Sequence, residues 1–210
     1  MKIQKTIFSA GCFWHIEDYF LKIKGVIKTT VGYTGGNTLN PTYNDVCTGD
    51  TGHAESVKIE FDSAVITFSE LLEHFWKIHD PCSLNKQGPD IGDQYRSAIF
   101  VINLFQKKEA LRQLNSYNKN KYNNKIVTKI ENLSKFYPAE KYNQKYLQKK
   151  ENRKTNKNKQ TKKKKKKKKK KKMDVVSQFL ECRRKKDAEG AISCLEQDAL
   201  LGSPWGYRYG

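Results

Sequence analysis

The sequence has no apolar run long enough to cross a bilayer, which takes about 20 consecutive residues. Its first residues, Met1 to Lys5, also lack the apolar core of a secretory signal peptide, and a β-patterned run begins directly with them. These two absences argue against a protein that spans a membrane. We therefore expect a cytoplasmic protein without a membrane association.

Paired cysteine motifs are missing as well. The cysteines are odd in number and scattered, and no two of them form a C-x-x-C pair. This pattern argues against a disulfide framework and against a zinc site, so we expect no bound metal. A reducing compartment and one working thiol fit the pattern better. The five cysteines are Cys12, Cys47, Cys82, Cys182 and Cys194.

Arginine is scarce in residues 1–150, and the positive charge of the chain lies mostly beyond them. Residues 1–150 carry 21 Lys and Arg against 15 Asp and Glu, a net charge of +6, out of +19 for the whole chain. Eleven consecutive lysines run from Lys162 to Lys172. Such a block repels itself and buries nothing, so we expect a catalytic domain over 1–150, a disordered linker over 151–172 and a short helical segment over 173–210.

Short strand and helix patterns alternate through residues 1–150. A capping box at Thr67 and Glu70 opens a helix that Asp80-Pro81 ends. Long irregular segments separate several of the patterns, and we expect these loops to carry the function. The sequence predicts a compact two-layer α+β sandwich with a short mixed sheet and a loop-rich active site. Further strands are expected at 2–9, 28–33, 56–61, 97–102 and 126–130, and further helices at 13–22 and 104–118.

Finer expectations concern the second half of this domain. In the helix over 104–118 the spacing predicts that Ala110, Leu111 and Leu114 point inward. Pro138 suits the first turn of a short helix, because its missing N–H does no harm there. Tyr142 and Tyr146 would then stack one turn apart.

The stretch Ser9-Ala10-Gly11-Cys12-Phe13-Trp14 lies at an expected turn from strand to helix. Unpaired amides and the positive end of the helix dipole at such a turn favour a thiolate, which is the reactive form of cysteine. Phe13 and Trp14 could wall an apolar pocket beside the sulfur. Cys12 is thus a candidate nucleophile, with a buried and inert cysteine as the alternative.

Other polar residues occur in the long loops. Glu55 precedes a strand, and enclosure among aromatic rings would raise its pKa enough for general acid catalysis; the alternative is a solvated carboxylate. Tyr43 and Tyr95 could donate hydroxyl groups to a substrate oxygen or be ordinary packing residues. His53 could act as a base for Cys12 in a cysteine hydrolase, or be a structural histidine of its loop.

Five motifs occur in one order along this chain: Gly-Cys-Phe-Trp, Gly-Tyr-Thr-Gly-Gly, Asn-Pro-Thr-Tyr, Thr-Gly-His-Ala-Glu and Gln-Gly-x-Asp-x-Gly-x-Gln-Tyr-Arg-Ser. In this order they resemble the peptide methionine sulfoxide reductases of the A type. The resemblance covers residues 3 to 148, including a late Tyr-Pro-Ala-Glu segment.

The resemblance implies the roles of the site residues. It makes Cys12 the catalytic cysteine and Glu55 the carboxylic acid that assists it. Tyr43 and Tyr95 fall on the hydroxyl donors to the sulfoxide oxygen, and Asp90 falls on a further acid of the active site.

The same resemblance implies the reaction and its partners. Phe13 and Trp14 would enclose the substrate methyl group. The substrate is the S epimer of methionine sulfoxide, free or in proteins, and Cys12 passes through a sulfenic acid during this repair of oxidative damage. No cofactor is expected to be bound, because thioredoxin or a small dithiol supplies the electrons. We expect a monomer.

The thiol that resolves the sulfenic acid stays open at this point. Many members of the family carry resolving cysteines in a flexible C-terminal tail, where this chain has its lysine-rich segment. Cys182 and Cys194 lie beyond that segment and would have to reach back, whereas Cys47 and Cys82 are nearer in sequence.

One other class of function competes with the reductase. The tract Lys162–Lys172 would bind phosphate polymers or other polyanions without sequence preference. The alternative is therefore a nucleic-acid or anionic-surface binding protein.

Overall fold

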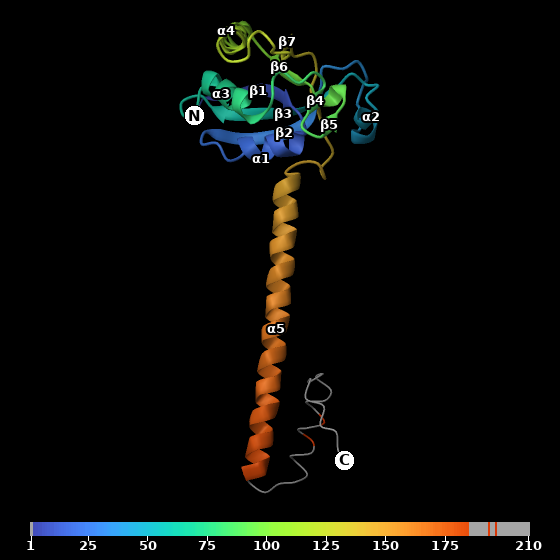
Figure 1. Ribbon diagram of the computed structural model, residues 1–210, viewed down its shortest axis with the longest axis vertical. Helices are drawn as coiled ribbons and strands as arrows, with labels where there is room; N and C mark the ends of the chain where they lie inside the picture. The colour runs from blue at the N-terminus through green and yellow to red at the C-terminus, as the bar shows by residue number, and fades with distance from the viewer. Residues whose placement is uncertain (1, 185–192, 194–195, 197–210) are drawn as a thin grey trace. The chain divides into compact units, whose positions relative to one another are not determined.

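The computed structural model describes residues 2–184, 193 and 196 (Figure 1). The chain divides into two compact units, Met1–Lys149 and Lys150–Gly210. The first unit holds every helix and strand of the predicted catalytic domain. No helix in the described residues is long and apolar enough to span a membrane.

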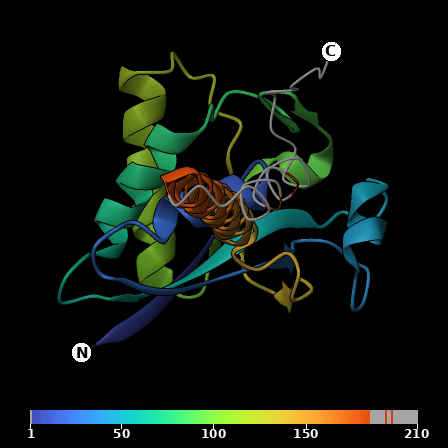
Figure 2. The same cartoon turned by 90° about the horizontal axis from the view of Figure 1, so that it is seen from below.

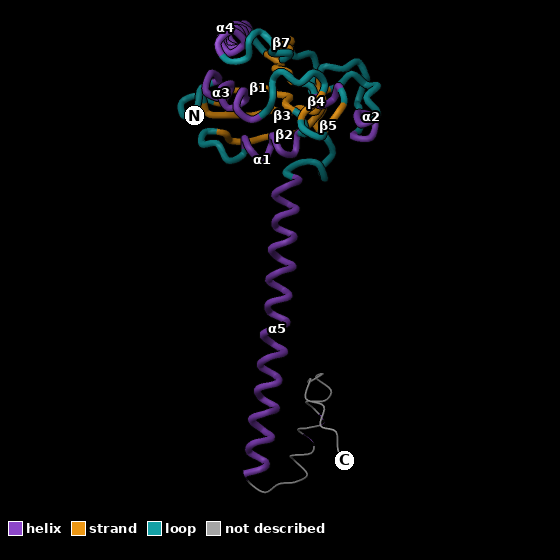
Figure 3. Tube along the Cα trace, in the orientation of Figure 1, coloured by secondary structure: helices purple, strands orange, loops and turns teal. Residues whose placement is uncertain are grey.

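A six-stranded sheet forms the centre of the first unit, with the strands in the order β7-β6-β1-β3-β2-β8 (Figure 3). Neighbouring strands run antiparallel, except that β6 and β7 are parallel. The chain makes that parallel connection through helix α4, Leu104–Asn120. The strands are β1 (Ile3–Ala10), β2 (Val26–Thr34), β3 (Ala54–Asp62), β6 (Ser97–Val101), β7 (Lys129–Asn132) and β8 (Tyr137–Pro138).

Two helices cover one face of the sheet, α1 (Phe13–Phe20) and α3 (Phe68–Ile78). Phe8 of β1 points into this layer, with its ring centroid 5.6 Å from that of Phe20 and 5.0 Å from that of Phe75. Figures 1 and 2 show α3 beside α4, and the Trp76 indole joins them by donating to Gln113 Oε1 over 3.1 Å. Burial of these large rings stabilises the layer, because apolar area leaves water.

The opposite face of the sheet carries a smaller apolar cluster. Side chains alternate between faces along a strand, so Ile7 points away from Phe8. Ile7 packs with Ala98 and Phe100, and Leu133 and Phe136 of the segment before β8 cover them. The expected two-layer α+β sandwich with a short mixed sheet is confirmed.

Most of the predicted elements are present. The capping box that opens α3 is formed as expected, with Thr67 accepting from the Glu70 amide and Glu70 accepting from Thr67. The short elements were missed, among them a five-residue helix, α2 (Tyr43–Cys47), that lies inside the segment expected to be irregular. A second capping box, between Thr42 and Asp45, opens it.

Two finer expectations were wrong. Ala110 is buried as predicted, but Leu111 is 42% exposed, because Gln106 and Gln113 point inward instead and form hydrogen bonds there. Pro138 belongs to β8 and opens no helix. Stacking of Tyr142 on Tyr146 stays a prediction, while the Tyr146 ring stacks on Trp14.

The lysine-rich segment differs from its prediction too. A single helix, α5 (Tyr146–Arg184), runs through residues 151–172, where the sequence predicts disorder. The helix contains no glycine or proline, and lysine has a fair helix propensity, although like charges one turn apart oppose it. Of the expected helical segment over 173–210, residues 185–192, 194–195 and 197–210 lie outside the described residues.

Candidate active site

Cys12 lies at the turn from β1 into α1, where it is the N-cap residue. Its carbonyl accepts hydrogen bonds from the amides of His15 and Ile16. Gly11 has φ +94°, a conformation that favours glycine, and a Cβ atom there would lie 2.7 Å from the Cβ and Cγ atoms of Gln87. Only glycine therefore lets the chain turn into α1 with Gln87 packed against it.

The electrostatics of Cys12 differ from the expectation. Burial raises the pKa of the thiol to about 11, and the charge of Glu55 adds to this. The amides of Trp14 and His15 favour the thiolate, as the turn predicts, but they do not outweigh burial. At neutral pH this environment favours the thiol over the thiolate, so burial opposes the effect that the turn predicts.

Glu55 comes from β3, next in the sheet to β1. The side chain is only 2% exposed, and its Oε2 atom accepts the Phe13 amide over 3.0 Å. Burial raises the pKa of Glu55 to about 7, and the charge of Asp90 contributes. Glu55 is thus not a solvated carboxylate, and near neutral pH it can both hold and donate a proton.

Tyr43 and Tyr95 reach the site from two different loops. Tyr43 is the first residue of α2, and Tyr95 ends a short 3₁₀ helix, η1 (Asp93–Tyr95). Burial raises the pKa of Tyr95 to about 12, and the charges of Glu55, Cys47, Asp90 and Cys12 contribute. Burial also raises the pKa of Tyr43. Both phenols stay protonated at neutral pH and can donate hydrogen bonds.

A hairpin of two short strands, β4 (Lys86–Gln87) and β5 (Asp90–Ile91), carries Asp90. Gln87 is the register partner of Asp90 and is also the residue that packs on Gly11. The negative charge of Asp90 acts on Cys12, Glu55 and Tyr95. Electrostatic interactions thus connect Cys12, Glu55, Tyr43, Tyr95 and Asp90 with one another.

A wall of aromatic rings borders these residues. The Trp14 ring stacks on Tyr43 with centroids 6.0 Å apart and on Tyr146 with centroids 4.1 Å apart. The Phe13 ring also stacks on Tyr43, with centroids 6.2 Å apart. Phe13 is buried and Trp14 is half-buried, so the indole offers an apolar surface to a ligand.

Three residues behind this wall were missed as site residues. Glu140 accepts the Tyr43 amide over 2.8 Å, and Asn143 accepts the Trp14 indole N–H over 3.1 Å. Tyr146 supplies the ring that backs the indole. The Pro-Ala-Glu sequence marks this segment, but the local pattern predicts a short helix and gives no sign of the contact with α1.

His53 does not serve Cys12. Its Nδ1 atom accepts the Gly36 amide over 3.1 Å, and its Nε2 atom is 2.8 Å from the Thr38 carbonyl oxygen. Both ring nitrogens therefore hold the loop after β2, and none is left to take a proton from the thiol. The structural reading of His53 is correct, and the cysteine hydrolase loses its base.

Among the described cysteines, Cys12, Cys47 and Cys82 are free thiols. The Cys47 thiol is exposed and hydrogen-bonds with the Tyr43 side chain, whereas Cys82 interacts with Asp80 rather than with the site. The backbone of Cys182 belongs to α5, and Cys194 lies outside the described residues. No group of side chains suited to a metal ion occurs in the part of the chain that the structure describes.

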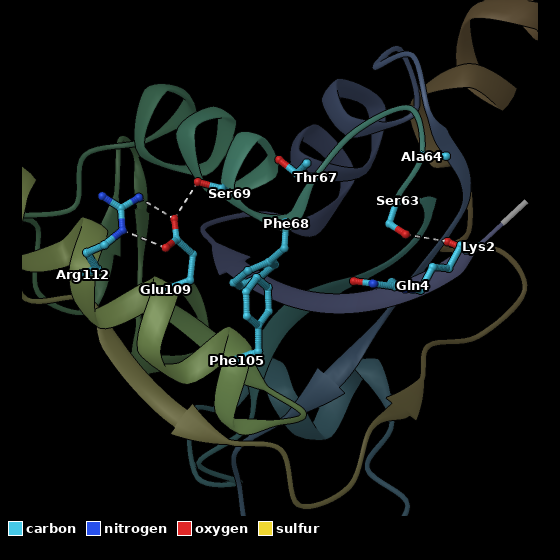
Figure 4. A pocket seen from close by; sticks show the side chains of 10 residues that line it. All are labelled: Lys2, Gln4, Ser63, Ala64, Thr67, Phe68, Ser69, Phe105, Glu109 and Arg112. Carbon is cyan, nitrogen blue, oxygen red and sulfur yellow. Dashed lines mark hydrogen bonds and ion pairs between the residues drawn. The ribbon is translucent and has the colours of Figure 1, made fainter.

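A separate groove of about 540 Å³ lies between the start of β1, the segment before α3, and α4 (Figure 4). The Glu109 carboxylate in this groove is held by Arg112 and Ser69. None of the predicted site residues lines the groove. Its lining is Lys2, Gln4, Ser63, Ala64, Thr67, Phe68, Ser69, Phe105, Glu109 and Arg112.

Comparisons with known proteins show which family the chain is similar to. The family model described as "Peptide methionine sulfoxide reductase" matches residues 4–175. The "Peptide methionine sulfoxide reductase MsrA" of Methanothermobacter thermautotrophicus is 49% identical over 154 residues, which cover 73% of this chain and 91% of that protein.

Solved structures show the same similarity. Methionine sulfoxide reductase A of Corynebacterium diphtheriae superposes with a TM-score of 0.68 at 35% identity, over 70% of this chain and 74% of that chain. Mxr1 from Saccharomyces cerevisiae in complex with Trx2 gives a TM-score of 0.51 at 27% identity, over 69% of this chain and 85% of that chain.

Proposed function

The chain belongs to the peptide methionine sulfoxide reductase family, and on that premise we propose that it reduces methionine S-sulfoxide, free or in proteins, to methionine. One observation carries the proposal. Cys12 is the N-cap residue of α1. The buried Glu55 carboxylate, whose pKa is about 7, accepts a hydrogen bond from the amide of Phe13, the residue after Cys12. A nucleophile and a proton donor therefore share one small site.

Two groups on the sulfoxide sulfur, the methyl group and the oxygen, would contact different residues of the site. Trp14 offers apolar surface to the methyl group with the buried Phe13 ring packed against it, and Tyr43 and Tyr95 offer hydroxyl donors to the sulfoxide oxygen. This oxygen carries negative charge, so donors aimed at it stabilise the charge that changes during reaction. Glu55 completes this set of donors with a proton that it can release.

Proton transfer prepares the attack. The Glu55 carboxylate takes the proton of the Cys12 thiol, and the protonated carboxyl group no longer raises the pKa of Cys12, so the thiolate persists. Glu55 then gives this same proton to the sulfoxide oxygen, which makes the sulfur a better electrophile. The Cys12 thiolate attacks that sulfur, and the oxygen passes to Cys12. Methionine leaves with the electron pair, and Cys12 becomes a sulfenic acid with no net change in protons.

A second thiol then restores Cys12. Sulfenic acid condenses with a thiol to form a disulfide and water, and an external dithiol reduces the disulfide by exchange. Mxr1 of yeast has been crystallised with Trx2, so we propose thioredoxin as the reductant here, with a small dithiol as its substitute. Of the described cysteines, Cys47 is the nearest candidate for the resolving thiol, because it contacts Tyr43.

The proposal is tested by replacing the sulfur. We expect Cys12→Ser to leave dabsyl-methionine S-sulfoxide unreduced, while Cys82→Ser, away from the site, keeps its activity. Intact mass after one equivalent of substrate, without reductant, should show either one added oxygen or the loss of two hydrogens on the wild type. Conversion by Cys12→Ser would contradict the assignment.

We further propose that the protein acts as a cytoplasmic monomer and that its lysines contact polyanions without sequence preference. The side chains of residues 162–170 are exposed along α5, which supports such a contact. This contact would accompany the reductase and not replace it, because the site residues all come from the first unit.

A further inference from the structure

The carboxylate of Glu140 accepts hydrogen bonds from three residues in or next to the site. Its Oε1 atom accepts the Tyr43 amide over 2.8 Å. Its Oε2 atom accepts the Tyr33 hydroxyl over 3.0 Å and the Asn143 amide nitrogen over 2.9 Å. These donors outweigh the effect of burial and hold the pKa of Glu140 below its usual range. The group is therefore a fixed anion in the neutral pH range.

Asn143 continues this connection to the aromatic wall. The residue is fully buried, and its Oδ1 atom accepts the Trp14 indole N–H over 3.1 Å. An indole can only donate and a carboxylate can only accept, so the amide of Asn143 can satisfy Trp14 and Glu140 in one orientation alone. Buried amides with both ends bonded hold their neighbours firmly.

Glu140 and Asn143 thus fix the position of the Trp14 ring relative to Tyr43. Tyr43 is held by its backbone to Glu140, and Trp14 is held by its indole to Asn143, which is itself bonded to Glu140. The Trp14 and Tyr43 rings stack at an interplanar angle of 21°. Tyr146 packs on the indole, so the ring has little room to turn.

This fixed position bears on the handedness of the substrate, and the argument rests on the proposed function. A sulfoxide sulfur carries an oxygen, a methyl group, a methylene chain and a lone pair. With the oxygen on its donors and the sulfur facing Cys12, the two epimers differ only by exchange of methyl and chain. A wall that admits only the methyl group therefore selects one epimer, provided that the wall cannot move.

We propose that Glu140 and Asn143 are positioning residues that determine epimer selectivity by fixing Trp14 relative to Tyr43. Neither residue touches the reacting atoms. Without their hydrogen bonds the indole shifts and the pocket accepts the methylene chain in place of the methyl group. A pocket that discriminates by one such group gains about 10- to 200-fold when it is rigid, and small displacements reduce that gain.

The experiment measures kcat/KM for separated S and R epimers of dabsyl-methionine sulfoxide, together with the melting temperature. Asn143→Leu keeps the size of the side chain but removes both polar contacts. We expect its S-to-R selectivity to fall about three- to tenfold, the size expected for one lost hydrogen bond. Trp14→Phe removes the indole donor from the other side, so a failure of Asn143→Leu to fold does not end the test.

Gln144→Leu is the matched control. This neighbouring amide forms its hydrogen bonds with the backbone of Val31 and Ala139 rather than with Trp14 or Glu140. We expect a lower melting temperature with unchanged S-to-R selectivity. The double variant Trp14→Phe, Asn143→Leu should lose less selectivity than the two single losses combined, because the single variants share the loss of the Trp14–Asn143 bond.

The outcomes separate the two proposals. An inactive wild type overturns the proposed function and this inference with it. An active wild type whose single variants keep their S-to-R selectivity overturns the inference alone. Equal losses for both epimers, or additive losses of selectivity in the double variant, also contradict it, because they indicate a structural role only.

Discussion

Cys12 and Glu55 hold their protons more tightly than isolated side chains do, and each charge works against the other. Burial raises both pKa values, that of Cys12 to about 11 and that of Glu55 to about 7. An ionised Glu55 keeps Cys12 as a thiol, whereas a protonated Glu55 permits the thiolate. The reactive state of the pair therefore has its proton on the carboxyl group, where the sulfoxide oxygen needs it.

Replacing Glu55 by glutamine should separate two properties that usually change together. Glu55→Gln removes the negative charge, so the pKa of Cys12 falls and iodoacetamide alkylates it faster at pH 8. The same change removes the general acid, so single-turnover methionine release slows by about a hundred- to ten-thousand-fold. Glu17→Gln, at another buried carboxyl group, should leave the alkylation rate unchanged. Slower alkylation together with full turnover would contradict this account.

The pH dependence of turnover follows from the same pair. The folded-state pKa of Glu55 is raised to about 7 and that of Cys12 to about 11, so the pair holds two protons below pH 7 and one proton between these values. The reactive state, a thiolate beside a protonated Glu55, also holds one proton. We therefore expect single-turnover reduction to rise up to an apparent pKa near 7, which belongs to the coupled pair, and then to level off. The measurement is a stopped-flow rate from pH 5.5 to 9. A rate that climbs steadily to pH 9, or one that falls above pH 7, would contradict this account.

The sequence predicted which residues form the candidate site better than it predicted their protonation. The motifs indicate Cys12, Glu55, Tyr43, Tyr95 and Asp90, and electrostatic interactions connect these residues. The effect of the turn on the Cys12 thiol was predictable and the larger effect of burial was not, because the helix start is visible in the sequence whereas burial is a property of the fold. Burial outweighs the amides here.

Elements with strong periodicity were predictable, and short ones were not. The strands of the sheet and α3 follow from alternation, helical spacing and a capping box. In α4 the predicted inward face was partly wrong because Gln113 is buried for its bond to Trp76, and hydrophobic patterning carries no signal for that. The hairpin of Asp90 and the segment of Glu140 were likewise invisible, because two-residue strands have no period.

The β4–β5 hairpin gives a prediction at the scale of an element. Gly11→Ala introduces a Cβ atom 2.7 Å from Gln87 at φ +94°, so the hairpin must move away from Cys12. Gly49→Ala is the matched control, because Gly49 has φ +85° and nothing within 4 Å of the added atom. Both variants should lose about 1–2 kcal/mol of stability from the backbone conformation.

Only Gly11→Ala should also lose activity, by about tenfold or more, because Asp90 is displaced with the hairpin. The measurements are the melting temperature and kcat/KM for each variant. Equal activity losses in the two alanine variants would show that backbone strain, rather than contact with Gln87, explains the effect.

For the whole molecule, function and charge lie in different units. The catalytic side chains come from β3, α1, α2 and the loops of the first unit, and its sheet is what brings them together. The second unit carries most of the positive charge of the chain. Its helix α5 includes the lysine tract, so helix formation there must overcome repulsion between neighbouring charges.

That repulsion gives a prediction on the intact chain. A helix places one residue about every 1.5 Å, close to the spacing of about 1.7 Å per charge along duplex DNA. Salt or inorganic polyphosphate should therefore increase the helix content by screening the charges of Lys162–Lys172, which is measured as a larger negative ellipticity at 222 nm. Glutamine at all eleven positions should abolish this increase and the retention on heparin, while kcat/KM for free methionine S-sulfoxide stays unchanged. Reduced turnover in that variant would mean that the tract takes part in catalysis, because the substitutions change no residue of the first unit.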